Sequence, residues 1–158
     1  MDERSNVLAA QFEKAIAEFA EAIEELPDDK WSATTGEGWT VSAAAQHVSG
    51  QFPLEMEYIT AAAEERPMPA YSWDDINGMN DGRAAKNSAA SKADVLKELR
   101  DGAASTAAYV RGLSDEQLVR AASLAVVGVA SVSAQQLIEG DVLLGHVKRH
   151  LASIRAAG

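Results

Sequence analysis

Histidine is scarce in this sequence, and its spacing is the first feature that could support chemistry. The chain contains 3 histidines: His146 and His150 lie one helical turn apart near the C-terminus, and His47 lies far upstream. Residues at i and i+4 share one face of a helix. Neutral imidazoles bind divalent first-row metals, and three protein ligands leave a coordination position open for water or substrate. The spacing therefore favours a metal site of the catalytic kind over a closed structural one.

The two rows of histidines are expected on the flanks of apolar helical stripes. The last helix is predicted over 133–156. On its surface the apolar stripe lies beside the row of His146 and His150. The members of that stripe are Leu137, Leu144, Val147, Leu151 and Ile154. His47 has a similar offset in a helix predicted over 41–64. Two flanking rows can meet at the rim of a bundle, where a pocket opens. A histidine on a helix flank is also commonly a surface or hydrogen-bonded residue, so the spacing alone leaves both interpretations open.

The elements that would carry these residues are helical. Apolar residues recur in steps of three and four, as in amphipathic helices. The segments that show this period span 5–26, 41–64, 91–113 and 133–156. A shorter helix is expected near 73–85, and Pro53 should kink the second long helix. The valine-rich stretch 121–132 fits either an extended loop or a short strand. The pattern predicts an all-α, antiparallel four-helix bundle in a single domain, 1–158.

Composition excludes several classes of function. The net charge is −10, which argues against nucleic acid and anionic membrane surfaces as partners. The chain has no cysteine, so it can form no disulfide and offers no thiolate ligand or cysteine nucleophile. No stretch approaches the roughly 20 apolar residues of a membrane span, and the N-terminus lacks the apolar core of a signal peptide. A soluble, cytoplasmic protein that acts on a small molecule is the expectation.

Further polar residues are candidates for contacts with a ligand. Gln51 and Tyr58 share the helical row of His47 and could line a pocket. Asn77 and Asn80 flank Met79 at the start of the short helix and could contact a substrate or orient a metal ligand. Glu139 lies two turns before His146 and could accept a proton or a hydrogen bond from a ligand. Each also has a plain structural interpretation, as a helix cap, a packing residue or a solvated side chain.

Three stretches of the sequence resemble the DinB-like superfamily of small four-helix proteins, which includes the N-terminal domain of mycothiol-dependent maleylpyruvate isomerase. The stretches are LPDDKWSATTGEGWTVSAAAQHV at 26–48, WDDINGMND at 73–81 and SVSAQQLIEGDVLLGHVKRHLASIRAA at 131–157. They resemble, in order, a Leu-Pro-acidic-Trp segment followed by Gly-Trp and a helical histidine, an asparagine-bearing helix start, and a last helix with His-x-x-x-His. Together they cover nearly the whole chain.

The resemblance implies an up-down-down-up bundle with a divalent metal held at one end by three side chains. Residue by residue, the histidine triad of the family maps onto His47, His146 and His150. In the maleylpyruvate isomerase branch, the first residue of the last pair is a glutamate. Because His146 stands there in this chain, the sequence is more similar to the general DinB-like branch.

The resemblance also implies a function. Family members of known activity use low-molecular-weight thiols, mostly as thiol S-transferases or thiol-dependent isomerases. The leading expectation is therefore a metal-dependent enzyme that activates a thiol, followed by one that activates water for hydrolysis. Zinc and nickel lead among the metals that three imidazoles accept. The alternative is a non-catalytic, stress-linked metal- or ligand-binding protein. The oligomeric state that the resemblance implies and the extent of apolar helix surface together predict a homodimer.

Overall fold

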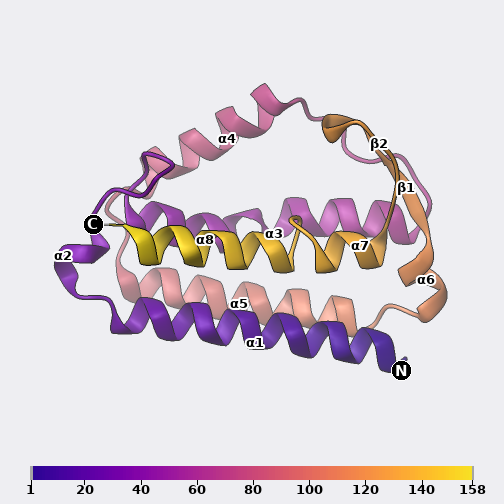
Figure 1. Ribbon diagram of the computed structural model, residues 1–158, viewed down its shortest axis with the longest axis horizontal. Helices are drawn as coiled ribbons and strands as arrows, with labels where there is room; N and C mark the ends of the chain where they lie inside the picture. Colours follow the sequence, from indigo (N-terminus) through magenta and orange to yellow (C-terminus); the bar gives the residue numbers. More distant parts are fainter. Residues whose placement is uncertain (1, 158) are drawn as a thin grey trace.

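Four helical columns pack around one apolar core in the computed structural model, which describes residues 2–157 apart from the side chain of Ala125. The fourth column is made of two helices in succession, α7 and α8 (Figure 1). The columns are α1 (Glu3–Glu25), α3 (Val41–Ala63), α5 (Lys92–Arg111), α7 (Ala134–Glu139) and α8 (Leu144–Ala156). The bundle predicted from the sequence is confirmed.

The helices form where the apolar period predicts them. In α1 the buried residues include Leu8, Phe12, Phe19 and Ile23, in steps of four and seven, while glutamates occupy the solvent face. The ring of Phe12 meets that of Phe52 from α3 edge to face, with centroids 5.7 Å apart. This geometry is the favoured one for aromatic pairs. The contact joins α1 to α3 across the core.

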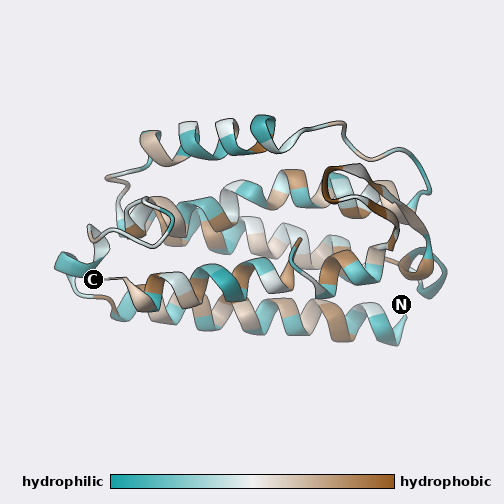
Figure 2. Ribbon diagram, turned by 45° about the horizontal axis from the view of Figure 1, so that its top comes forward, coloured by the Kyte–Doolittle hydropathy of each residue, from teal (hydrophilic) through white to brown (hydrophobic). Residues whose placement is uncertain are grey.

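The order of the columns is up-down-down-up. α1 and the α7–α8 column run in one direction, and α3 and α5 run in the other (Figure 1). Because α3 and α5 are parallel, the chain must travel back along the bundle between them, and α4 (Trp73–Lys86) makes that return. α4 is largely hydrophilic (Figure 2) and buries only Ile76 and Ala84. It packs against α3, where Gly50 leaves room for the side chain of Arg83.

The connection before the last column contains a small β-hairpin. The valine-rich stretch, which fitted either a loop or a strand, forms two antiparallel strands with a bulge between Ala122 and Leu124. The remaining elements are α2 (Asp28–Trp31), α6 (Asp115–Val119), β1 (Ala121–Leu124), the 3₁₀ helix η1 (Ala125–Val127) and β2 (Val129–Ser133). Among residues 2–157, no helix has the length and apolar character needed to cross a membrane.

The last helix differs from its prediction. A single helix over 133–156 was expected, but the chain leaves the helical path after Glu139 and resumes it at Leu144. Gly140 is extended, with φ −90° and ψ −158°. The amide of Gly145 donates to the carbonyl of Gly140 at 2.8 Å, one residue further back than in an α-helix. This break changes the rotation of α8 relative to α7, so the row of His146 does not continue into α7.

We predict that Gly145→Ala destabilises the protein and Gly78→Ala does not. A Cβ atom at Gly145 would lie 2.9 Å from the backbone oxygen of Gly140 and 2.8 Å from Oδ1 of Asp141, so the break must distort. A Cβ at Gly78, inside α4, would meet no atom within 4 Å. Gly78→Ala should raise the free energy of unfolding by about 0.4–1 kcal/mol. Urea denaturation measures the free energy of unfolding of both variants. Equal effects of the two substitutions would contradict a requirement for glycine at position 145.

Candidate metal centre

Two helices place the three histidines. The hydroxyl of Thr40 caps α3 by accepting from the amide of Ala43, at 3.2 Å, and His47 follows two turns later. His146 lies in the first turn of α8, directly after the break, and His150 lies one turn further. Because α3 and α8 run antiparallel and pack side by side, the two rows face each other (Figure 1).

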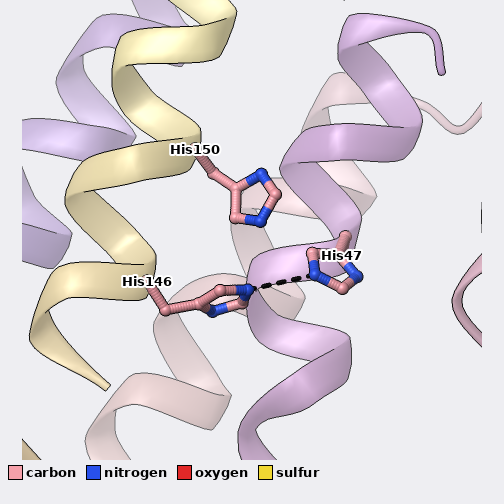
Figure 3. Close-up of side chains that lie close together, drawn as sticks. All are labelled: His47, His146 and His150. Atoms are coloured by element: carbon pink, nitrogen blue, oxygen red, sulfur yellow. Dashed lines mark hydrogen bonds between the residues drawn. The ribbon is translucent and has the colours of Figure 1, made fainter. Parts of the chain in front are cut away.

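The three imidazoles form a compact cluster (Figure 3). Nε2 of His47 lies 3.1 Å from Nε2 of His146, which is hydrogen-bonding distance. The ring centroids are 5.0 Å apart for His47 and His146, 4.8 Å for His47 and His150, and 4.6 Å for His146 and His150. One ring nitrogen from each residue lies within 4.8 Å of the other two. The structure thus brings together all three residues that the sequence nominated.

The cluster is more deeply buried than the flank positions predicted. The exposed fractions of His47, His146 and His150 are 4%, 5% and 4%. The helical stripe could not show what covers the flank. The indole of Trp39, from the loop before α3, packs on His47 with ring centroids 5.0 Å apart. Its Nε1 donates to Asp81 of α4 at 3.3 Å, which ties the loop to the return helix.

Burial keeps the imidazoles neutral. The pKa of His47 is lowered from 6.5 to about 2, mainly by desolvation, and the neighbouring His146 and His150 contribute to this shift. Desolvation is also the main cause that lowers the pKa of His146 and of His150 to about 4, with Arg149 adding to both shifts. Neutral imidazole is the form that binds a metal. All three rings are therefore ready to act as ligands at neutral pH.

A buried glutamate, which the sequence analysis did not identify, contacts the cluster from behind. Oε1 of Glu55 lies 2.7 Å from Nδ1 of His146, and both side chains are 6% exposed. Burial raises the pKa of Glu55 well above its usual value. A carboxylate beside the remote nitrogen of a histidine ligand fixes the tautomer and the ring orientation. One signal was available in the sequence, because Glu55 is a charged residue two turns after His47, between Leu54 and Met56.

The third histidine has a more distant acidic neighbour. Nδ1 of His150 lies 3.6 Å from Oε1 of Glu37, whose side chain is 32% exposed. Ser153 donates to Oε2 of the same carboxylate at 2.6 Å. Glu37 lies in the loop that also carries Trp39.

The donor set fits a metal ion. Nδ1 of His47 and both ring nitrogens of His150 are buried and have no hydrogen-bond partner among residues 2–157. Ligands about 2.0–2.1 Å from one tetrahedral ion lie roughly 3.3 Å apart, close to the 3.1 Å between His47 and His146. No fourth histidine, cysteine, aspartate or glutamate of the described chain joins the group. A metal bound here would keep an open position, as catalytic sites do.

A cavity of about 600 Å³ adjoins the cluster and lies between α3, α4, the hairpin and the last column. His47 and His146 form part of its wall. Clefts of roughly 300–1,000 Å³ commonly hold small molecules. The open side of the cluster therefore faces a space of the size that a small-molecule ligand requires.

The other predicted residues divide into two groups. Gln51 and Tyr58 line the cavity, and Gln51 accepts a hydrogen bond from Arg83 at 2.9 Å. Asn80 also lines it, with Oδ1 buried and unpartnered within residues 2–157. Asn77 is exposed and does not reach the cavity. Glu139 is exposed, accepts from Gln135 at 2.7 Å and lies outside the cavity, because the break before α8 separates it from the histidine row.

The fold and the site define a class of protein: an up-down-down-up four-helix bundle in which three histidines from two antiparallel helices form a buried cluster that could hold a metal ion. The chain belongs to the DinB superfamily, whose family model matches residues 11–154. The resemblance inferred from the sequence motifs is confirmed. The chain matches none of the curated proteins.

Solved structures share the fold at low sequence identity. YfiT from Bacillus subtilis, described as a probable metal-dependent hydrolase with an unusual four-helix bundle topology, superimposes with a TM-score of 0.73 at 18% identity, over 98% of this chain and 86% of that one. A mutant of mycothiol-dependent maleylpyruvate isomerase gives a TM-score of 0.71 at 15% identity over 99% of this chain. This chain spans 61% of the isomerase. An uncharacterised Clostridium difficile protein gives 0.73 at 14% identity, over 98% and 95% of the two chains.

We predict that Glu55→Gln weakens metal binding while the bundle stays folded. The amide retains the shape of the side chain but cannot ionise, so it cannot supply the negative charge that a bound metal would favour on Glu55 beside Nδ1 of His146, and such losses cost about 10–100-fold in metal affinity. Competition with a chromophoric chelator measures the affinity. Glu139→Gln, at the exposed glutamate, is the matched control and should bind like the wild type. Equal affinity of all three proteins would contradict a role for Glu55.

We also predict that acid destabilises the metal-free protein. The folded-state pKa values of about 2, 4 and 4 for the three histidines lie below 6.5, so the unfolded chain binds protons first. Stability from the neutral imidazoles is complete above about pH 6.5 and is lost as the pH falls towards 4. Because the pKa of Glu55 is raised, this residue has the opposite effect on the pH dependence of stability. It is one carboxyl group, whereas three imidazoles favour the loss of stability in acid.

The measurement is urea unfolding of the metal-free protein at about pH 7 and pH 4.5, where we expect a loss on the order of a few kcal/mol. The variant with all three histidines replaced by glutamine should lose much less. A wild-type protein as stable at the lower pH as at the higher would show that the imidazoles are not held neutral by burial.

Proposed function

We propose that this protein is a metal-dependent enzyme in which His47, His146 and His150 hold one divalent metal ion. One observation carries the proposal: three buried, neutral imidazoles converge, with unpartnered nitrogens, at the wall of a cavity. Burying polar groups without partners costs roughly 1–3 kcal/mol each. A cluster of this kind is difficult to account for as packing alone, and a shared metal ion would satisfy it.

Each residue around the cluster has a distinct task in this proposal. A bound divalent ion, zinc or nickel in the first instance, would lower the pKa of a thiol or a water molecule that enters its open position. Glu55 orients His146 through Nδ1. Trp39 covers His47 and keeps solvent from that side. Gln51, held by Arg83, presents its remaining hydrogen-bonding capacity to the cavity next to the cluster.

The nucleophile in this proposal comes from outside the chain, because the sequence has no cysteine. A low-molecular-weight thiol is the leading candidate: it would lose its proton to solvent, and its sulfur would form a bond to an electrophilic carbon of the second substrate. The bond from that carbon to the leaving group, or to the ring oxygen of an epoxide, would break, and the departing atom would keep the bonding electrons. Water is the second candidate. The names of the similar proteins support both, since one is described as mycothiol-dependent and the other as a probable metal-dependent hydrolase.

We further propose that the protein is a homodimer. Several large apolar side chains outside the cavity are exposed on the described surface, among them Val7, Met79 and Val119. Light scattering of the purified protein tests this proposal, and a monomeric mass at micromolar concentration would contradict it.

The first prediction of the proposed function concerns metal content. Elemental analysis of the purified protein, after incubation with zinc or nickel and removal of the excess, should give about one ion per chain, because the donor set makes one site. The variant His146→Ala with His150→Ala should bind none. Lys148→Ala, an exposed position on the same helix, should bind like the wild type. Circular dichroism shows whether the double variant still folds, and the single variant His150→Gln provides a milder change.

Turnover separates an enzyme from a binding protein. A small thiol supplied with an epoxide or an alkyl halide should form a thioether in the presence of the loaded protein, and a chelator should stop the reaction. Hydrolysis of esters and amides is assayed in parallel. Metal binding without turnover in either assay would favour the alternative of a non-catalytic metal-binding protein. Absence of metal binding would overturn the proposal itself.

A further inference from the structure

The cavity beside the cluster is electrically asymmetric. Its charged lining residues all lie at the histidine end. Glu55 contacts Nδ1 of His146 at 2.7 Å, Arg149 lies in the helical turn between His146 and His150, and Asp141 lies against the start of α8, with Oδ1 2.8 Å from where a Cβ of Gly145 would be. The charged side chains of the cavity are therefore concentrated around the position where a metal would bind.

The opposite end carries no charge. Tyr58 lies on the same face of α3 as His47, about 16 Å further along the axis at about 1.5 Å per residue. There the wall is built from the hairpin and α7. The side chains that the hairpin and α7 contribute are Leu124, Val126, Val127, Val132, Gln136 and Leu137. Five of these six are aliphatic, and none of the six can ionise.

Part of this aliphatic wall faces solvent without a covering partner. Val127 is 48% exposed and Trp73, across the cavity on α4, is 53% exposed. Binding is favoured when a ligand removes apolar surface of this kind from water. The volume of about 600 Å³ suits a small molecule. The occupant indicated is a molecule that is polar at one end and hydrocarbon at the other.

We propose that the substrate is an amphipathic small molecule whose reacting polar group lies at the histidine cluster and whose uncharged, aliphatic part extends along α3 to the hairpin. This inference rests on the proposed function, because the position of the metal determines which end of the substrate reacts. It adds the substrate class: a molecule with a hydrocarbon chain of several carbons rather than a small, fully polar acid. Val127 and its neighbours in the hairpin would then be specificity-determining residues.

A series of straight-chain hydroxamates tests the proposal. The hydroxamate group chelates a metal with open positions, and the alkyl chain can grow one methylene at a time. Calorimetric titration of the zinc-loaded protein with acetohydroxamate, butanohydroxamate, hexanohydroxamate and octanohydroxamate should show affinity rising roughly three- to fourfold per methylene. Affinity that does not change with chain length, while acetohydroxamate itself binds, would overturn the proposal and leave the metal site standing.

Two hairpin valines provide a matched pair of variants. Val127 lines the cavity, whereas Val129 is 39% exposed on the same hairpin and lies outside it. Val127→Asp should abolish most of the gain with chain length and leave the affinity for acetohydroxamate unchanged. Val129→Asp should keep the wild-type dependence. An equal effect of both substitutions would show that the hairpin acts only as a structural element, and would also overturn the proposal.

A metal-free measurement separates this inference from the proposed function. Titration of the metal-free protein with octanol should shift the fluorescence of Trp73 to the blue, because the alkyl chain would displace water from the indole. The variant Trp73→Phe identifies the signal among the three tryptophans. If the hydroxamates fail to bind because no metal is held, a blue shift still supports the aliphatic site, and its absence overturns it.

Discussion

The contact between two antiparallel helices, α3 and α8, through three uncharged imidazoles is the constraint on which the rest of the structure depends. Imidazoles in the interior must remain neutral, because a charge there would be desolvated and would lie beside two other rings. Neutral rings still need partners for their nitrogens. Only the pair of His47 and His146 satisfies part of this need within the cluster. The bundle thus holds a cluster of polar side chains in which several ring nitrogens have no hydrogen-bond partner among residues 2–157.

The surrounding elements keep this arrangement in place. The break between α7 and α8 sets the rotation at which α8 presents His146 and His150 to α3. Trp39 closes one side of His47 and is itself held by Asp81 of the return helix. Glu55 contacts Nδ1 of His146 at 2.7 Å. Each of these features lies in a different part of the chain, and the cavity adjoins the cluster at His47 and His146.

Local sequence rules could predict the scaffold, because they act within one helix. The apolar period placed all four columns, and hydroxyl caps at Thr40 and Ser133 mark the starts of α3 and α7. The histidine pair could be found because i and i+4 positions share a face. Features that depend on two segments could not be predicted in this way. Glu55 is recognisable only when His146 packs against it. Asn80, rather than Asn77, faces the cavity because of how α4 lies on α3.

The return helix has a consequence for how this fold can diversify. α4 exists because two parallel columns must be joined, yet it buries few of its residues and contributes little to the core. It nevertheless supplies Trp73, Ile76 and Asn80 to the wall of the cavity. Substitutions in α4 can change the shape of the cavity at little cost in stability. The helices α3 and α8 carry the histidines, and their packing in the core limits which substitutions they tolerate. The three histidines and the α4 part of the cavity wall therefore lie on separate helices, and α4 is joined to the cluster through Asp81, which holds Trp39, and Arg83, which holds Gln51.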